Sequence, residues 1–93
     1  LKGVSNKPDK DYHFIEHYLA KDGDQIVGCS GLYSYHNNPQ EAWLSWFGVL
    51  PTVRKNGYGQ QILNASKELA KQKGVSLNAL MIFIIQDYLE RNE

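Results

Sequence analysis

The sequence contains a single cysteine, Cys29, and no excess charge, because its ten basic and ten acidic residues cancel to a formal net charge of zero. A lone cysteine excludes an intrachain disulfide and a site built from several cysteines, and it suits a reducing cytoplasm. The charge balance provides no general attraction to nucleic acid or an anionic membrane, so neither is expected as a partner. The longest apolar run, Ala79–Ile85, is far too short to span a bilayer.

The chain has the size and composition of one modest globular domain, with 93 residues of which 42% are hydrophobic and 22% charged. It begins with Leu1 and ends at Glu93 directly after an apolar segment, so we expect residues 1–93 to be a single, truncated domain. Two of its three histidines, His13 and His17, are four residues apart, which groups ligands on a helix but not on a strand. We therefore expect no metal.

Hydrophobic patterning predicts three strands in the first half of the chain. Residues 1–11 mix glycine, proline and charged residues without periodicity, which indicates a loop or a frayed end. Apolar residues alternate over Phe14–Ala20, and Asp22-Gly23 then predicts a tight hairpin turn into a second strand, Ile26–Tyr35. Glu41–Leu50 is apolar enough to lie centrally in a sheet.

The second half predicts a helix from Gly57 to a stop at Gly74, followed by an ambiguous segment. Leu80–Ile85 suits a short buried parallel strand, whereas Leu77–Leu89 also repeats at helical spacing. We favour the strand, because this run has little polar face and because of the resemblance described below. The expected fold class is therefore α+β with a mixed sheet: an antiparallel hairpin, then strand, loop, helix and strand, with a parallel pair.

The most informative stretch joins the third strand to the helix. A helix N-terminus exposes unpaired backbone N–H groups and a partial positive charge. Gly57 and Gly59 remove side chains that would hold an anion away, and Arg54 and Lys55 add positive charge beside these amides. Such a turn predicts a pyrophosphate site.

Arg54-x-x-Gly57-x-Gly59, placed after an apolar strand and before an amphipathic helix, resembles the coenzyme A motif of GNAT N-acetyltransferases. The preceding hairpin is also similar to that family, and the resemblance covers roughly Phe14 to Gly74. Other phosphate motifs fit less well. A P-loop needs Lys and Ser or Thr where Gln60-Gln61 stand, and a dinucleotide fingerprint needs a third glycine and a downstream acid.

The resemblance implies acetyl-coenzyme A as co-substrate and transfer of its acetyl group to a primary amine, by direct attack in a ternary complex. In this family two parallel strands splay apart, and the pantetheine arm pairs with the first of them through its amides. By this resemblance, the third strand would hold pantetheine and the loop would hold pyrophosphate. The cofactor-binding residues implied are Phe47, Gly48, Val49, Arg54, Lys55, Asn56, Gly57, Tyr58 and Gly59.

Acid–base residues are harder to assign. Some family members carry a Glu eleven residues before the motif arginine, where this chain has Trp43, so Glu41 is the candidate catalytic base. The alternative for Glu41 is a solvated charge at a strand start. The family's general acid is often a Tyr in the helix after the last strand; Tyr88 is near that place, but we assign it no role. If the strand is regular, Trp43 and Trp46 lie on opposite faces.

Two rival interpretations remain open. The last third of the chain also resembles the two helices of a ribbon-helix-helix DNA-binding module, which a helix at residues 80–85 would favour. A non-catalytic fragment of the acetyltransferase fold, with or without bound coenzyme A, is the other. The acceptor, a small molecule or a protein amine, is not readable. In a truncated domain an exposed sheet edge favours association with another chain, for instance as a homodimer.

Overall fold

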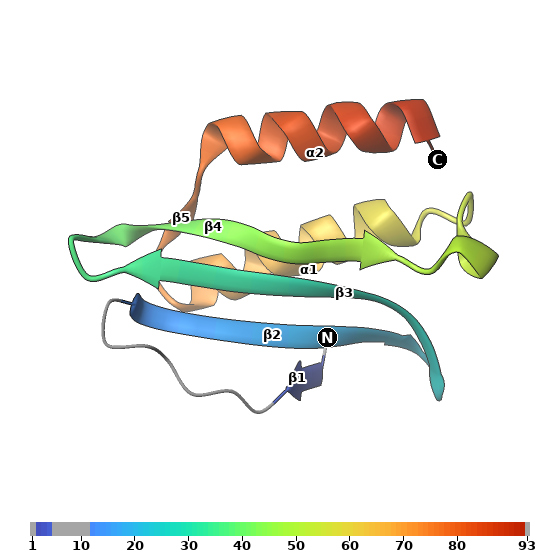
Figure 1. The fold of residues 1–93 in the computed structure, drawn as a ribbon, viewed down its shortest axis with the longest axis horizontal. Coiled ribbons are helices and arrows are strands. Elements are labelled where there is room, and N and C mark those ends of the chain that lie inside the picture. Colours follow the sequence, from blue (N-terminus) through green and yellow to red (C-terminus); the bar gives the residue numbers. More distant parts are fainter. Residues whose placement is uncertain (1, 5–11, 93) are drawn as a thin grey trace.

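The computed structural model describes residues 2–4 and 12–92, which form one sheet and two helices (Figure 1). The strands are β1 (Lys2–Val4), β2 (Tyr12–Asp22), β3 (Gln25–Tyr35), β4 (Asn38–Val49) and β5 (Ser76–Leu77). The helices are α1 (Tyr58–Gln72) and α2 (Ala79–Asn92), and a 3-10 turn spans Pro51–Val53. The strands lie in chain order across the sheet, antiparallel except for the parallel pair β4 and β5. The predicted α+β class and its order of elements are confirmed.

The hairpin between β2 and β3 forms at the predicted turn. Asp22 pairs with Gln25, and Gly23 has a φ of +62°, a left-handed conformation that glycine adopts without steric cost. The second turn, between Tyr35 and Asn38, is equally short. These two turns place three long antiparallel strands side by side in the sheet, and the end of β4 then leads into α1.

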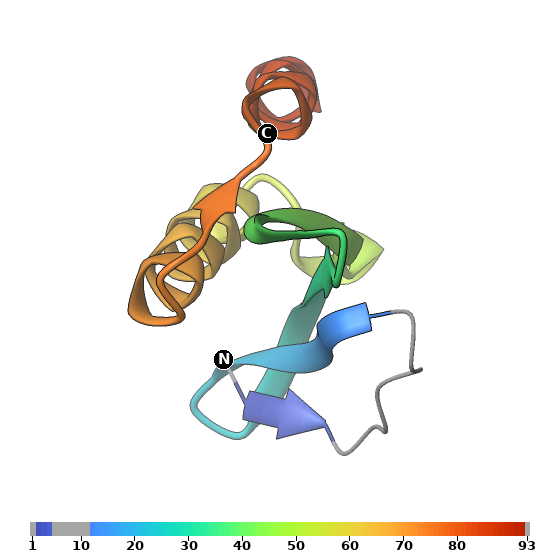
Figure 2. The same cartoon turned by 90° about the vertical axis from the view of Figure 1, so that its left-hand side faces the viewer.

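One face of the sheet carries the core. α1 lies beside β3 and β4, and α2 runs along β4 beyond the short β5 (Figures 1 and 2). Leu32 and Leu44 from the sheet pack with Leu63 of α1 and Leu89 of α2 in one buried cluster. Leu32 and Leu44 are paired across β3 and β4, so they share the face that α1 covers, and α2 adds Leu89 to this cluster from the β4 edge. Within the described residues, neither helix is long and apolar enough to cross a bilayer.

The prediction of a final strand at Leu80–Ile85 is wrong. These residues lie in α2, and the parallel strand is only Ser76–Leu77. Asn78 begins the helix, because its side-chain Oδ1 accepts from the Met81 N–H at 3.1 Å and its main-chain oxygen accepts from Ile82. The helix buries Leu89 and half-buries Met81 and Ile85 at helical spacing. Helical periodicity and an asparagine cap thus outweigh the apolar composition of the run.

This helix meets one requirement of the ribbon-helix-helix alternative, but the rest of the fold contradicts that alternative. Residues 51–57 form a 3-10 turn and a loop instead of a ribbon strand. The strand before them, β4, lies inside a larger sheet, and α1 packs on that sheet.

The prediction of a loop at residues 1–11 is also corrected in part. Lys2–Val4 pairs antiparallel with β2, Lys2 opposite Leu19. Residues 1 and 5–11 lie outside the described residues. The local composition does not favour this strand, so its formation depends on the exposed edge that β2 offers to the chain.

Candidate functional site

A bulge interrupts β4 close to its end. The register with β3 passes from Gly31 opposite Ser45 to Cys29 opposite Gly48, so that Trp46 and Phe47 together face Ser30. Trp46 has a φ of +53°, which is unusual for a bulky residue. Such bulges bend a strand and redirect the side chains that follow. Here the bulge separates the regular part of β4 from its last residues, Phe47 to Val49.

The outer edge of β4 loses its strand partner before it reaches this bulge. β5 pairs with β4 only at Glu41 and Ala42, and the Asn78 N–H donates to the Ala42 carbonyl at 2.9 Å. The chain then turns into α2, which runs along β4 in place of a longer β5 (Figure 1). Within residues 12–92, no strand therefore pairs with the outer edge of β4 beyond Ala42.

A cavity of about 350 Å³ lies between this edge and α2. We call it the β4–α2 cavity; it is lined by Phe47, Gly48, Val49, Arg54, Ile84, Ile85, Tyr88 and Leu89. Its walls are mainly apolar, and Arg54 is the only charged residue among them. The structure therefore brings the predicted strand residues together with the predicted arginine. The α2 contribution, including Tyr88, was not assigned from the sequence, although the helical spacing of residues 77–89 pointed to it.

The loop that carries Arg54 ends at the N-terminus of α1. The Arg54 Nε donates to the Val49 carbonyl at 3.4 Å, and the Asn56 side-chain amide donates to the Val53 carbonyl at 2.9 Å. Lys55 and Gly57 have φ values of +69° and +78°. The side chain of Asn56 therefore stabilises a tight loop in which the residues before and after it adopt left-handed conformations.

The helix N-terminus itself is favourable for an anion. Gly57 is the N-cap residue and provides no side-chain hydrogen bond, and the first turn of α1 contains no acidic residue. Arg54 and Lys55 make no ion pair within the described part of the chain. The positive end of the helix dipole and two cations therefore act together in this loop. Of the loop residues, Arg54 lines the β4–α2 cavity, whereas Asn56 and Tyr58 line a neighbouring cavity.

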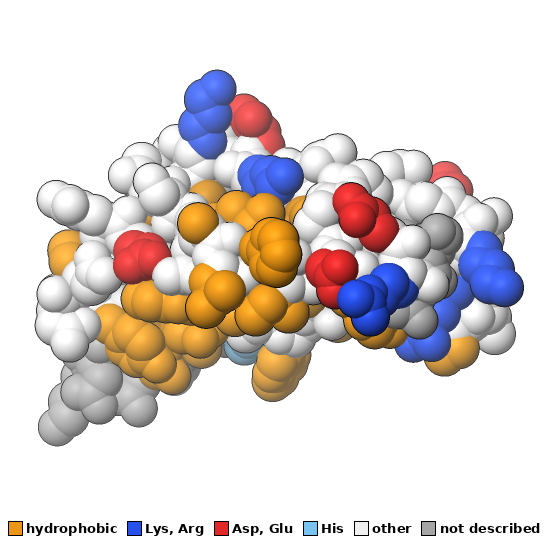
Figure 3. Space-filling view, turned by 90° about the horizontal axis from the view of Figure 1, so that it is seen from above, with side chains coloured by type: hydrophobic (Ala, Val, Ile, Leu, Met, Phe, Trp, Pro, Cys, Tyr) orange, Lys and Arg blue, Asp and Glu red, His pale blue; other side chains and the backbone are white. Residues whose placement is uncertain are grey.

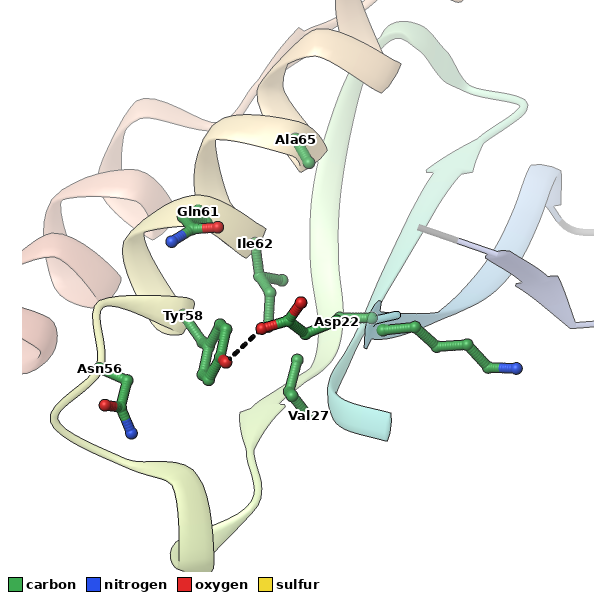
Figure 4. A pocket seen from close by; sticks show the side chains of 9 residues that line it. Asp22, Val27, Asn56, Tyr58, Gln61, Ile62 and Ala65 are labelled. Carbon is green, nitrogen blue, oxygen red and sulfur yellow. Dashed lines mark hydrogen bonds between the residues drawn. The ribbon is translucent and has the colours of Figure 1, made fainter. Parts of the chain in front are cut away.

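Tyr58, another predicted binding residue, turns its side chain toward a different cavity. Its hydroxyl donates to Asp22 Oδ2 at 2.6 Å, across a depression of about 450 Å³ between the hairpin and α1 (Figure 4). This hydrogen bond, together with burial and the charge of Asp22, raises the pKa of Tyr58. At the β4–α2 cavity Tyr58 can thus contribute only main-chain groups, and Gly59 behind it is buried.

The candidate base, Glu41, lies away from both cavities. It is six residues before Phe47 in β4, about 20 Å along an extended strand. Its Oε2 accepts from the Asn38 side-chain amide at 3.0 Å, and its Oε1 accepts from that of Asn78. These bonds connect the start of β4 to the residue that begins α2.

The uncovered face of the sheet is rich in aromatic rings. Tyr33 stacks on Trp43, and His17 stacks on Trp46. Because His17 and Tyr33 lie on the same face of β2 and β3, the two tryptophans also share that face. The expectation of opposite faces is wrong because the bulge at Trp46 shifts the alternation of β4. In the described segments, no cluster of His, Cys, Asp and Glu is arranged to hold a metal ion.

α2 also has an apolar outer side. Four of its residues with large apolar or aromatic side chains are exposed, and Figure 3 shows hydrophobic side chains gathered in the middle of this face of the molecule. They are Leu80, Phe83, Ile84 and Tyr88. Ile84 and Tyr88 also line the β4–α2 cavity, so this outer side is continuous with the cavity wall.

A family model described as the acetyltransferase (GNAT) family matches residues 4–87. Among solved structures, a GNAT family acetyltransferase from Staphylococcus aureus subsp. aureus is 17% identical with a TM-score of 0.58, over 69% of this chain and 53% of that one. A predicted acetyltransferase from Clostridium acetobutylicum, solved with acetyl-CoA, is 16% identical with a TM-score of 0.56, over 80% and 56%. The chain thus spans about half the length of these structures. The search of curated proteins finds no significant match.

Proposed function

Because this chain belongs to the acetyltransferase (GNAT) family, we propose that it binds acetyl-CoA and transfers the acetyl group to a primary amine. The observation that carries this proposal is the β4–α2 cavity, where an unpaired strand edge leads to a helix N-terminus with Arg54 beside it. Strand edges bind extended amide-containing chains, and helix N-termini bind phosphate. Acetyl-CoA carries both kinds of group, in that order along its length.

The residues present fit this co-substrate. The main-chain groups of Phe47, Gly48 and Val49 would pair with the amides of pantetheine, and the apolar side chains of α2 would cover its methylene groups. The loop would hold the pyrophosphate through main-chain amides and two cationic side chains. Its residues are Arg54, Lys55, Asn56, Gly57, Tyr58 and Gly59.

The chemistry requires stabilisation of negative charge on the thioester oxygen and a proton for the leaving thiolate. A main-chain N–H near Phe47, redirected by the bulge, would stabilise the oxygen. Tyr88 is the side chain in the cavity lining with an acidic O–H, so we assign it the protonation of the thiolate. Glu41 is too distant to accept the amine proton directly, and we assign it a structural role, with the proton leaving to solvent.

A thermal-shift measurement with acetyl-CoA tests this proposal. A ligand at one hundred times its dissociation constant stabilises the folded state by about 2.7 kcal/mol. We expect a clear shift for the parent chain, a smaller one for Arg54→Ala, and none for Gly57→Glu, which puts a carboxylate at the anion site. Gly23→Glu is the matched control, because Gly23 also has a positive φ and open space around it but lies in the hairpin.

No shift in a folded parent chain would contradict the proposal. Release of free thiol from acetyl-CoA in the presence of primary amines then separates an enzyme from a non-catalytic coenzyme-binding fragment. Binding without amine-dependent thiol release would support the fragment. A cytoplasmic location, proposed from the lone Cys29, agrees with this co-substrate.

A further inference from the structure

Trp46 presents a large aromatic surface beside the proposed reaction centre. Its side chain is 71% exposed, and one face of the indole stacks on the His17 imidazole with ring centroids 4.1 Å apart and planes 13° apart. A tryptophan exposed to this degree does not contribute most of the stabilising free energy that burial of its side chain would give. Its backbone is also in the left-handed region, at φ +53°. Strain of this kind persists where the surrounding structure enforces it, and it concentrates at functional sites.

Three strands cooperate to hold this indole. His17 is on β2, Gly31 on β3 and Trp46 on β4, so the imidazole has to reach across β3. A Cβ atom on residue 31 would lie 2.8 Å from His17 Cδ2 and 2.4 Å from Ser45 Oγ. The absence of a side chain at Gly31 therefore permits the stack. The Cys29 thiol additionally donates to the Trp46 carbonyl, which fixes the bulged backbone.

Trp46 lies on the side of the sheet from which an acceptor would approach the thioester. It directly precedes Phe47, the first strand residue of the β4–α2 cavity. α1 covers the opposite face of the sheet, where Leu32 and Leu44 are buried, and α2 lies along the β4 edge (Figure 1). An acceptor that reaches a thioester at Phe47 therefore has to approach from the face that carries Trp46 and His17.

We propose that the Trp46 indole recognises the acceptor in its ammonium form, so that the acceptor is a cationic primary alkylamine. Alkylamines have a pKa of about 10.4 and arrive protonated at neutral pH. Indole is the best side chain for a cation–π contact, and its face opposite His17 is available because the side chain is largely exposed. His17 is a positioning residue: it holds the indole and does not touch the acceptor.

The binding test uses tetramethylammonium and its neutral isostere tert-butanol, added to the protein loaded with acetyl-CoA. The chain has two tryptophans, so the indole N–H signals of Trp46 and Trp43 can be followed separately by NMR. Tetramethylammonium should shift the Trp46 signal in a saturable manner and leave Trp43 unaffected, while tert-butanol shifts neither. Equal responses to the two probes, or no response, would overturn the proposal.

The kinetic test uses 1-butylamine as acceptor and measures both Michaelis constants. Trp46→Leu should raise the KM for the amine about tenfold and leave that for acetyl-CoA within twofold, whereas Trp46→Phe should show an intermediate value. His17→Ala should raise the amine KM, and His17→Phe, which preserves a stacking ring, should restore it. An unchanged amine KM in Trp46→Leu, or no turnover of 1-butylamine, overturns the inference.

This inference rests on the proposed function, and the two fail differently. If acetyl-CoA gives no thermal shift, or if it binds but no primary amine releases thiol from it, the proposed function fails. If acetyl-CoA binds but the cation does not select Trp46, only the assignment of the acceptor class fails.

Discussion

The Tyr58 hydroxyl and the Asp22 carboxylate, 36 residues apart in the chain, are joined by a hydrogen bond of 2.6 Å (Figure 4). Tyr58 is the first residue of α1, and Asp22 is the last residue of β2. The bond therefore connects the proposed pyrophosphate loop to the hairpin on the far side of α1. Side chains within the loop cannot provide this restraint, because Asn56 bonds only to nearby carbonyls of the loop.

Tyr58→Phe should lower the melting temperature and speed amide hydrogen exchange in the first turn of α1. Asp22 raises the pKa of Tyr58 above its ordinary value of 10.0, so this bond stabilises the fold below pH 10 and is lost as the phenol ionises at higher pH. The difference from the parent chain should therefore shrink above pH 10. Tyr35→Phe, at an exposed tyrosine of the aromatic cluster, is the control. Identical exchange in parent and Tyr58→Phe would contradict this role.

Gly28 and Gly48 allow a matched test of the strand edge at the cavity. A Cβ atom on Gly28 would lie 2.3 Å from the Gly48 carbonyl oxygen, whereas one on Gly48 would have Cys29 Sγ as its nearest neighbour at 4.0 Å. Gly28→Ala should therefore displace β4, lower stability by about 1–3 kcal/mol and weaken acetyl-CoA binding. Gly48→Ala should change neither the stability nor the binding of acetyl-CoA by much. Chemical denaturation and the thermal shift with acetyl-CoA measure the two effects, and equal behaviour of the variants would count against the geometry.

The buried pair Ser30 and Ser66 should respond asymmetrically to substitution. Their hydroxyls are 2.8 Å apart, and Ser66 also donates to the Ile62 carbonyl at 2.7 Å, so Ser30 is the donor within the pair. Ser66→Ala leaves the Ser30 hydroxyl buried without an acceptor and should cost about 1–3 kcal/mol. Ser30→Ala removes a donor and should cost less. Urea unfolding of both single variants and the double variant checks this, and a larger loss in Ser30→Ala would reverse the assignment.

Protonation of Glu16 should contribute to the loss of stability at acidic pH. Burial acts to raise the pKa of Glu16, but hydrogen bonds from Lys73 and Tyr18 and the charge of Lys73 outweigh it, so the pKa lies below 4.5. The ionised form thus stabilises the fold above about pH 4.5, and this contribution is lost as the pH falls through the folded-state pKa. Because the Glu16 side chain is 37% exposed, the effect should stay below about 1 kcal/mol.

Urea midpoints from pH 3 to 7 measure this dependence. Glu16→Gln should flatten the profile between about pH 3 and 5, whereas Glu68→Gln, at an exposed position of α1, should leave it unchanged. If the urea midpoints of the parent chain and of Glu16→Gln depend on pH in the same way, Glu16 does not contribute to the pH dependence of stability.

Two helix leucines allow a test of where the core lies. Leu63 of α1 is fully buried in the cluster with Leu32, whereas Leu80 of α2 is 66% exposed. Leu63→Ala should cost about 2–5 kcal/mol through lost burial and a cavity, and Leu80→Ala should stay within about 0.5 kcal/mol. Denaturant unfolding measures both. A large loss at Leu80 would show that the outer side of α2 is covered in solution.

Local backbone chemistry was sufficient to predict much of this fold. Gly23 after Asp22 specified the hairpin, Gly57 and Gly74 marked the two ends of α1, and the arginine with its glycines identified the loop. Each of these features depends on a few adjacent residues. A left-handed turn or a helix terminus restricts the same short segment whatever surrounds it, so neighbouring residues carry the information.

The remaining features depend on partners distant in the chain. Lys2–Val4 forms a strand only because β2 presents an edge, and Leu80–Ile85 is helical because a helix can pack Met81, Ile85 and Leu89 against the core. The bulge at Trp46, which brings both tryptophans to one face, follows from the pairing of β4 with β3. It is packing and strand register that place Tyr88 in the cavity and Glu41 far from it, because such contacts form between segments that no local pattern brings together.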